Sequence, residues 1–76
     1  MAKILERTNF GDNLRILRYR LSISQSEVAR RLHIGRARYI YWEDNKAEPP
    51  YYLLVKIAKF HGITIDQLIN TLPKHN

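Results

Sequence analysis

Two helix start signals follow each other closely between residues 24 and 45, and they restrict the chain to a fold with two short, adjoining helices. At the first start, Ser24 can accept a hydrogen bond from a free backbone N–H group, and Glu27 can bond back to the backbone of Ser24. Ile23 and Val28 occupy the two positions of a hydrophobic staple. These signals predict a helix over about residues 25–32.

The second start comes after a break in the apolar periodicity at residues 33–35. Gly35 stands at the cap position, and Ile34 and Tyr39 stand at the staple positions. A second short helix is expected over about residues 36–43, with Tyr39 and Trp42 facing inward. Asn45 is expected to end this helix in the left-handed conformation that glycine usually adopts.

A third helix is predicted before this pair. Phe10, Leu14, Leu17 and Leu21 repeat at helical spacing, which indicates a helix over about residues 10–20.

Two more helices are predicted after the pair. Residues 51–61 form the first, ended by Gly62, and the residues expected to face inward there are Tyr51, Leu54, Ile57 and Ala58. Thr64 and Gln67 form a capping box that begins the last helix, which ends before Pro73.

The predicted fold is therefore all-α, with five short helices around one core. No strand period, internal repeat or low-complexity tract interrupts this pattern. We expect a flexible N-terminal arm over residues 1–8, one domain over residues 9–73 and a tail over residues 74–76.

Composition excludes several classes of function. The chain has no cysteine, so a disulfide, a thiolate zinc site and a cysteine nucleophile are impossible. The three histidines are too scattered along the chain to form a metal site. No nucleophile–base pair or glycine-rich phosphate loop stands out, so we expect neither an enzyme nor a cofactor. No apolar run is long enough to span a membrane, and a soluble, cytoplasmic chain is expected.

The charge of the chain is concentrated in one stretch. The formal net charge is +6, from 13 Lys and Arg against 7 Asp and Glu. Residues 15–38 contain seven arginines and only one acidic residue, Glu27, so this stretch carries the whole excess. A basic block of this kind favours a polyanion such as DNA, RNA or an anionic membrane, although a solvated charged face is the plain structural alternative. Arginine favours phosphate because its guanidinium group binds oxygens in pairs.

With the five helices placed, the chain resembles the lambda-repressor-like helix-turn-helix domain of phage repressors, Cro proteins and Xre-type bacterial regulators. The resemblance covers residues 10–68 and rests on segments that fall in the family's order. These segments are LRILR at 14–18, ISQSEVARRL at 23–32, IYWEDNK at 40–46, LVKIAKF at 54–60 and GITIDQL at 62–68.

The chain also departs from the family pattern at several positions. The family prefers glycine where this chain has His33 and Asn45, and Ser or Thr where it has Gly35. Pro50 replaces a common capping serine, and His61 occupies a position that is usually a core hydrophobe.

The resemblance implies a recognition helix over residues 36–43 that enters the major groove of DNA. Arg36, Ala37 and Tyr41 match the positions that contact bases. Arg36 is the strongest candidate, since a bidentate arginine to guanine is the commonest specific contact. For Arg36 a phosphate contact is the alternative, and Tyr41 could instead lie on the sugar–phosphate wall.

The resemblance also implies contacts that position the protein on DNA. The residues expected to contact phosphate are Ser24, Gln25, Arg38 and Lys46. Arg18 and Glu43 match a pair that bridges the first and third helices in phage repressors. For Gln25 and Lys46 the alternative is a solvated side chain, and for Arg18 and Glu43 it is two unrelated surface charges.

Three functions remain open on the sequence alone. The leading hypothesis is a sequence-specific DNA-binding transcriptional regulator, most simply a repressor, acting as a homodimer on a two-fold site. Ile69 and Leu72 are the candidate dimer contacts, with packing inside one chain as the alternative. A second reading is an antitoxin-like protein that acts with a protein partner. A third is an RNA-binding module, which would use exposed aromatic residues such as Tyr19, Tyr51 and Tyr52.

Overall fold

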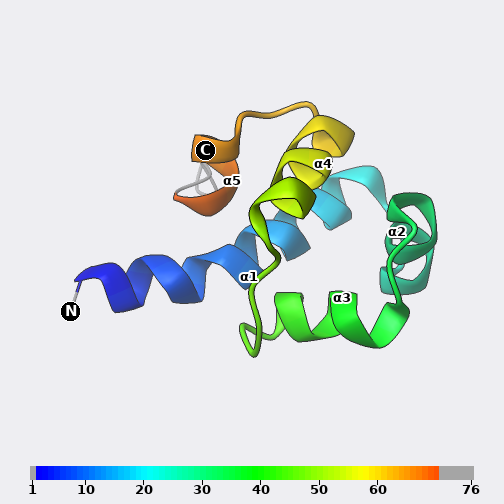
Figure 1. Cartoon of the computed structure of the whole chain (residues 1–76). Coiled ribbons are helices and arrows are strands. Elements are labelled where there is room, and N and C mark those ends of the chain that lie inside the picture. Colours follow the sequence, from blue (N-terminus) through cyan, green and yellow to red (C-terminus); the bar gives the residue numbers. More distant parts are fainter. Residues whose placement is uncertain (1, 71–76) are drawn as a thin grey trace.

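The computed structural model describes residues 2–70, with side chains from residue 10 onward, and its regular structure is entirely helical (Figure 1). The helices are α1 (Ala2–Leu21), α2 (Gln25–Leu32), α3 (Arg36–Glu43), α4 (Tyr51–His61) and α5 (Ile65–Ile69). No strand occurs among the described residues, and the all-α prediction is confirmed. None of these helices is both long and apolar enough to cross a membrane.

The first helix differs from the prediction. A start near residue 10 is wrong, because α1 begins at Ala2 and includes residues 2–8, which were expected to belong to a flexible arm. Residues 2–8 contain neither glycine nor proline, so helix propensity alone permits the extension even without an apolar period. This part of α1 extends beyond the other helices (Figure 1). The tail expected over residues 74–76 lies outside the described residues.

All five helices contribute to one hydrophobic core. Tyr39 and Trp42 are buried as predicted, with rings in an edge-to-face contact. The other buried apolar side chains are those of Phe10, Leu14, Leu17, Val28, Ala29, Leu32, Leu53, Ile57, Ala58 and Leu68. The prediction that Tyr51 faces inward is wrong, since this side chain is 70% exposed at the first position of α4 and Leu53 fills the core instead. Leu21 is also exposed, at the very end of α1.

Four of the helices end in the same kind of turn, a Schellman motif. The left-handed residue is Ser22, His33, Asn45 or Gly62, with φ angles between 57° and 70°. In each turn the next residue donates its backbone N–H to the carbonyl five positions earlier. That next residue is an isoleucine packed against the core in three turns, Ile23, Ile34 and Ile63, whereas it is Lys46 after α3. The left-handed conformation predicted for Asn45 is confirmed.

The predicted helix starts are present, with one difference. Thr64 and Gln67 form the complete capping box before α5. At α2 the Ser24 hydroxyl accepts the backbone N–H of Glu27 at 3.0 Å, as expected. The return bond from the Glu27 side chain is replaced, because its carboxylate binds Arg30 and Arg31, each at 2.6 Å. These two guanidinium groups lower the pKa of Glu27 to about 2.

The buried ring of His61 leads us to expect that the stability of the fold depends on pH. The ring lies against Phe60 at the end of α4, and its Nε2 atom is buried with no hydrogen-bond partner among the described residues. Burial lowers the pKa of His61 from 6.5 to about 4. Above pH 6.5 the ring is neutral in both folded and unfolded chains. As the pH falls from 6.5 through 4, the unfolded chain takes up the proton first, so stability is lost in this window.

We therefore expect the urea concentration at the midpoint of unfolding to decrease when the pH is lowered from 7 to 4. The decrease should be smaller for His61→Leu than for the wild type. The variant restores an apolar side chain at the same position and removes the titrating group. Protonation of Glu43 affects both proteins equally, so the difference between the two pH profiles isolates His61. Parallel profiles would show that the His61 ring titrates as an exposed histidine does.

Candidate nucleic-acid interface

The third helix is divided into a buried side and an exposed side. Tyr39, Trp42 and Glu43 are almost completely buried, since each is at most 1% exposed. Arg36, Ala37 and Tyr41 lie on the exposed side of α3. The period of the helix therefore turns all three candidate base-contacting residues away from the core. An exposed helical side with long polar side chains is the kind of surface that fits the major groove.

The buried side of α3 is fixed by a carboxylate with many partners. The structure brings Arg18 and Glu43 together, with Nε to Oε2 at 2.7 Å and Nη2 to Oε1 at 3.1 Å. The Tyr39 hydroxyl donates to Oε2 at 2.6 Å, and Gln25 Nε2 donates to Oε1 at 3.0 Å. Arg15 approaches Oε1 at 3.7 Å. One glutamate thus ties α3 to both α1 and the first residue of α2.

The electrostatics of this cluster keep Glu43 charged. Burial raises the pKa of Glu43, but hydrogen bonds from Arg18, Tyr39 and Gln25 outweigh burial and hold this pKa below its ordinary value. The pKa of Tyr39 is raised by burial and by its bond to the carboxylate, so the phenol stays a neutral donor. The bond to Glu43 likewise raises the pKa of Arg18. The cluster is therefore a fixed ionic support for α3 at neutral pH.

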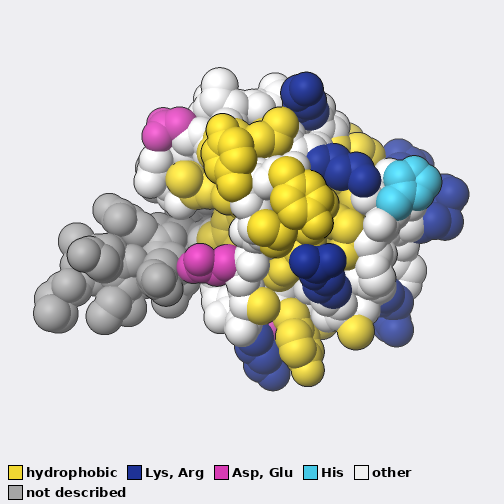
Figure 2. All heavy atoms as spheres, in the orientation of Figure 1, with side chains coloured by type: hydrophobic (Ala, Val, Ile, Leu, Met, Phe, Trp, Pro, Cys, Tyr) yellow, Lys and Arg dark blue, Asp and Glu magenta, His cyan; other side chains and the backbone are white. Residues whose placement is uncertain are grey.

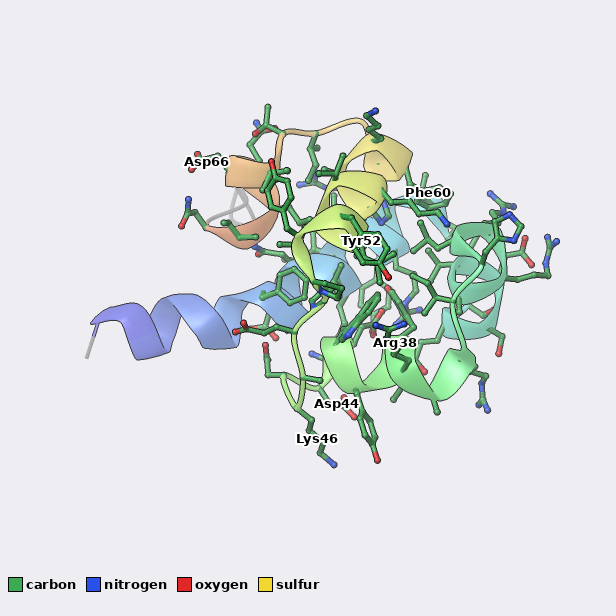
Figure 3. All side chains as sticks on the ribbon, in the orientation of Figure 1. Arg38, Asp44, Lys46, Tyr52, Phe60 and Asp66 are labelled. Atoms are coloured by element: carbon green, nitrogen blue, oxygen red, sulfur yellow. The ribbon has the colours of Figure 1, made fainter. Side chains whose placement is uncertain are left out.

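The candidate phosphate contacts have different surroundings. Ser24 is exposed and caps α2, while Gln25 is half-buried because its amide reaches Glu43. The Arg38 guanidinium lies over the Trp42 ring, 5.5 Å from its centre. Lys46 places its ammonium group 5.9 Å from the centre of the Tyr41 ring. Figure 3 shows Arg38 on α3 and Lys46 beyond the end of this helix, pointing away from the body of the domain.

The seven arginines of residues 15–38 form two groups: those in ion pairs within the chain and those with no ion-pair partner among the described residues. Arg15 and Arg18 pair with acidic residues on or near α3, and Arg30 and Arg31 pair with Glu27. Within residues 10–70, the remaining three form no ion pair: Arg20, Arg36 and Arg38. Two of these three belong to α3. Basic side chains are spread over much of the face in Figure 2, whereas acidic ones lie mainly toward α5 and the N-terminal part of α1.

Sequence reasoning missed three residues of α1 that bond to other parts of the fold: Gly11 and Arg15 to the turn after α3, and Asn13 to α5. The Gly11 N–H donates to Asn45 Oδ1 at 2.9 Å, and buried Asn13 donates to the Leu68 carbonyl at 2.8 Å. Arg15 joins Asp12 and Asp44. A polar residue within a helical pattern is normally expected on the surface of the protein. The roles of these residues become visible only when α1 packs against segments that are distant in the sequence. No group of three metal-binding side chains occurs in the described part of the chain.

Comparison with known proteins places the chain in a family. A family model described as Helix-turn-helix matches residues 14–68. The chain is 31% identical over 61 residues to the cryptic phage CTXphi transcriptional repressor RstR of Vibrio cholerae, an alignment covering 80% of this chain and 55% of RstR. It is 33% identical over 61 residues to the HTH-type transcriptional activator BcrR of Enterococcus faecalis, covering 80% of this chain and 30% of BcrR. No solved structure matches significantly.

The fold and the exposed third helix define a helix-turn-helix domain. The chain belongs to the Helix-turn-helix family, and its resemblance to the Cro and Xre-type transcriptional regulators is confirmed. It spans about half the length of RstR and less than a third of BcrR.

Proposed function

We propose that this chain binds double-stranded DNA in a sequence-specific manner, with α3 in the major groove. The proposal rests on the difference between the buried side and the exposed side of α3. Its buried side is fixed to α1 and α2 through Glu43, and its exposed side offers Arg36 without an ion-pair partner among the described residues. A rigid helix with a free guanidinium group can read guanine through two hydrogen bonds. Ala37 and Tyr41 would contact neighbouring bases, and Ser24, Gln25, Arg38 and Lys46 would contact phosphates.

We further propose a repressor that acts as a homodimer in the cytoplasm. A small domain bound to DNA excludes other proteins from the same site, so repression requires no additional contact. One recognition helix reads only a few base pairs, and a two-fold dimer doubles this number. Ile69 on α5 is 37% exposed, which suits a dimer contact. Leu72, the other candidate, lies outside the described residues.

Selection of bound fragments from random duplex DNA tests the function directly, and a palindromic consensus is expected. Size-exclusion chromatography of the complex tests the dimer. An RNA-binding module would instead bind single-stranded RNA more tightly than the selected duplex, through exposed residues such as Tyr19, Tyr51 and Tyr52. An antitoxin-like protein would yield no consensus until its protein partner was added.

We expect the affinity for the selected duplex to fall steeply with salt. Each phosphate neutralised by a basic side chain should add about −0.9 to the slope of log affinity against log salt. Titrations at several salt concentrations give this slope. A response independent of salt would exclude phosphate contacts as the source of binding.

A further inference from the structure

The turn that ends α3 differs from the Schellman turns that end α1, α2 and α4. After α1, α2 and α4, the residue that follows the left-handed position is an isoleucine on the core. After α3 this residue is Lys46, which donates its backbone N–H to the Tyr41 carbonyl at 2.9 Å. A Schellman motif brings these two residues into contact, and here the contact is the Lys46 ammonium over the Tyr41 ring. The turn therefore carries a cation to the exposed side of α3.

The left-handed residue of this turn, Asn45, is bonded to a distant part of the chain. Its Oδ1 atom accepts the backbone N–H of Gly11, a residue of α1 that lies 34 positions earlier. The approach is so close that a Cβ atom at Gly11 would lie 2.8 Å from Asn45 Nδ2 and would also collide with the Glu43 carbonyl. Glycine at position 11 is thus what allows α1 to reach this turn. A glycine at position 45 would form the same turn without this bond.

We infer that Asn45 is a positioning residue of the DNA interface. By bonding Gly11, it anchors to α1 the turn that carries Lys46, and so fixes the place of the Lys46 ammonium beside Tyr41. The inference rests on the proposed DNA-binding function, because the role of Asn45 is exerted through the phosphate contact of Lys46. Without the anchor the turn still forms, but Lys46 is held less firmly against the backbone of the duplex.

The test compares Asn45→Gly with Asn45→Asp. Glycine keeps the left-handed turn and loses the acceptor, whereas aspartate keeps an acceptor for Gly11. We expect Asn45→Gly to melt within a few degrees of the wild type, because the relaxed backbone offsets the lost hydrogen bond. Hydrogen exchange of the Gly11 amide should be faster in Asn45→Gly than in Asn45→Asp.

The decisive readout is the salt slope of duplex binding. Lys46→Ala should reduce the slope of the wild type by about 0.9, the contribution of one phosphate. In the Asn45→Gly background, Lys46→Ala should change the slope much less, because the contact is already weakened. In the Asn45→Asp background, Lys46→Ala should have its full effect. A mere stabilising role for Asn45 would leave the effect of Lys46→Ala the same in all three proteins.

The possible outcomes distinguish a failure of this inference from a failure of the proposed DNA-binding function. If the wild type binds the duplex and Lys46→Ala acts fully in Asn45→Gly, the inference is overturned and the proposed function stands. If the wild type binds no duplex, the proposed function fails and the inference fails with it.

Discussion

Arg18→Ala is expected to cost the domain roughly 3 kcal/mol of its free energy of unfolding. The guanidinium of Arg18 makes two hydrogen bonds to the buried carboxylate of Glu43 and a third, at 3.1 Å, to the Ile23 carbonyl. Removing it leaves a buried negative charge that keeps the neutral donors Tyr39 and Gln25 but, among the described residues, only one cation, Arg15, at 3.7 Å. Breaking a buried pair in this way typically costs 3–5 kcal/mol, and we take about the lower end because Arg15 compensates in part.

The expected loss is large for a domain of this size. Stabilities of about 0.05–0.15 kcal/mol per residue imply a total of roughly 4–11 kcal/mol for 76 residues. At about 4–8 °C per kcal/mol, the melting temperature of Arg18→Ala should fall by about 12–24 °C. Thermal melts followed by circular dichroism measure this shift.

Arg30→Ala is the matched control. Arg30 also pairs with a glutamate at short distance, but its side chain is 72% exposed and Glu27 keeps Arg31 as a second partner. An exposed pair is screened by water, so this variant should melt close to the wild type. Equal melting temperatures for Arg18→Ala and Arg30→Ala would mean that the Arg18–Glu43 pair contributes no more than an exposed one.

Local sequence signals predict most of the helices of this fold, but not the start of the first one. The bounds of α2, α3 and α4 follow from local signals, because a capping serine, a glycine stop and an apolar period act within a few residues. The burial of Tyr39 and Trp42 follows from the same period. The start of α1 does not, since nothing in residues 2–8 either demands or forbids a helix.

The candidate site likewise has features that the sequence predicts and features that only the fold reveals. Helical spacing places Arg36, Ala37 and Tyr41 on one side of α3, and family resemblance pairs Arg18 with Glu43. From composition alone, all seven arginines of residues 15–38 are expected to favour binding to a polyanion. In the fold, four of them form ion pairs within the chain instead. The bond between Gly11 and Asn45 joins residues 34 positions apart, and no local pattern encodes such a contact.

Arg36→Ala is expected to remove specificity rather than general affinity. Arg36 is the first residue of α3 and is exposed, and the N-terminal end of a recognition helix is the part that contacts base edges. A bidentate contact to guanine is worth about 1–3 kcal/mol, so affinity for the selected site should fall by a factor of roughly 5–150. Affinity for random duplex DNA should fall far less, by about the contribution of one charge. The variant should also tolerate substitution of one base pair in each half-site.

Gln25→Ala is the control that separates contacts to phosphate from contacts to bases. Phosphates carry no direct sequence information, so Gln25→Ala should weaken binding to the selected site and to random DNA by similar factors. Because Gln25 also bonds to Glu43, its melting temperature must be measured beside its affinity. The quantity to compare is the ratio of the two affinities, at one salt concentration, for the wild type and both variants. If Arg36→Ala leaves this ratio unchanged, Arg36 binds phosphate, and specificity resides in Tyr41, in Arg38 or in the shape of the DNA.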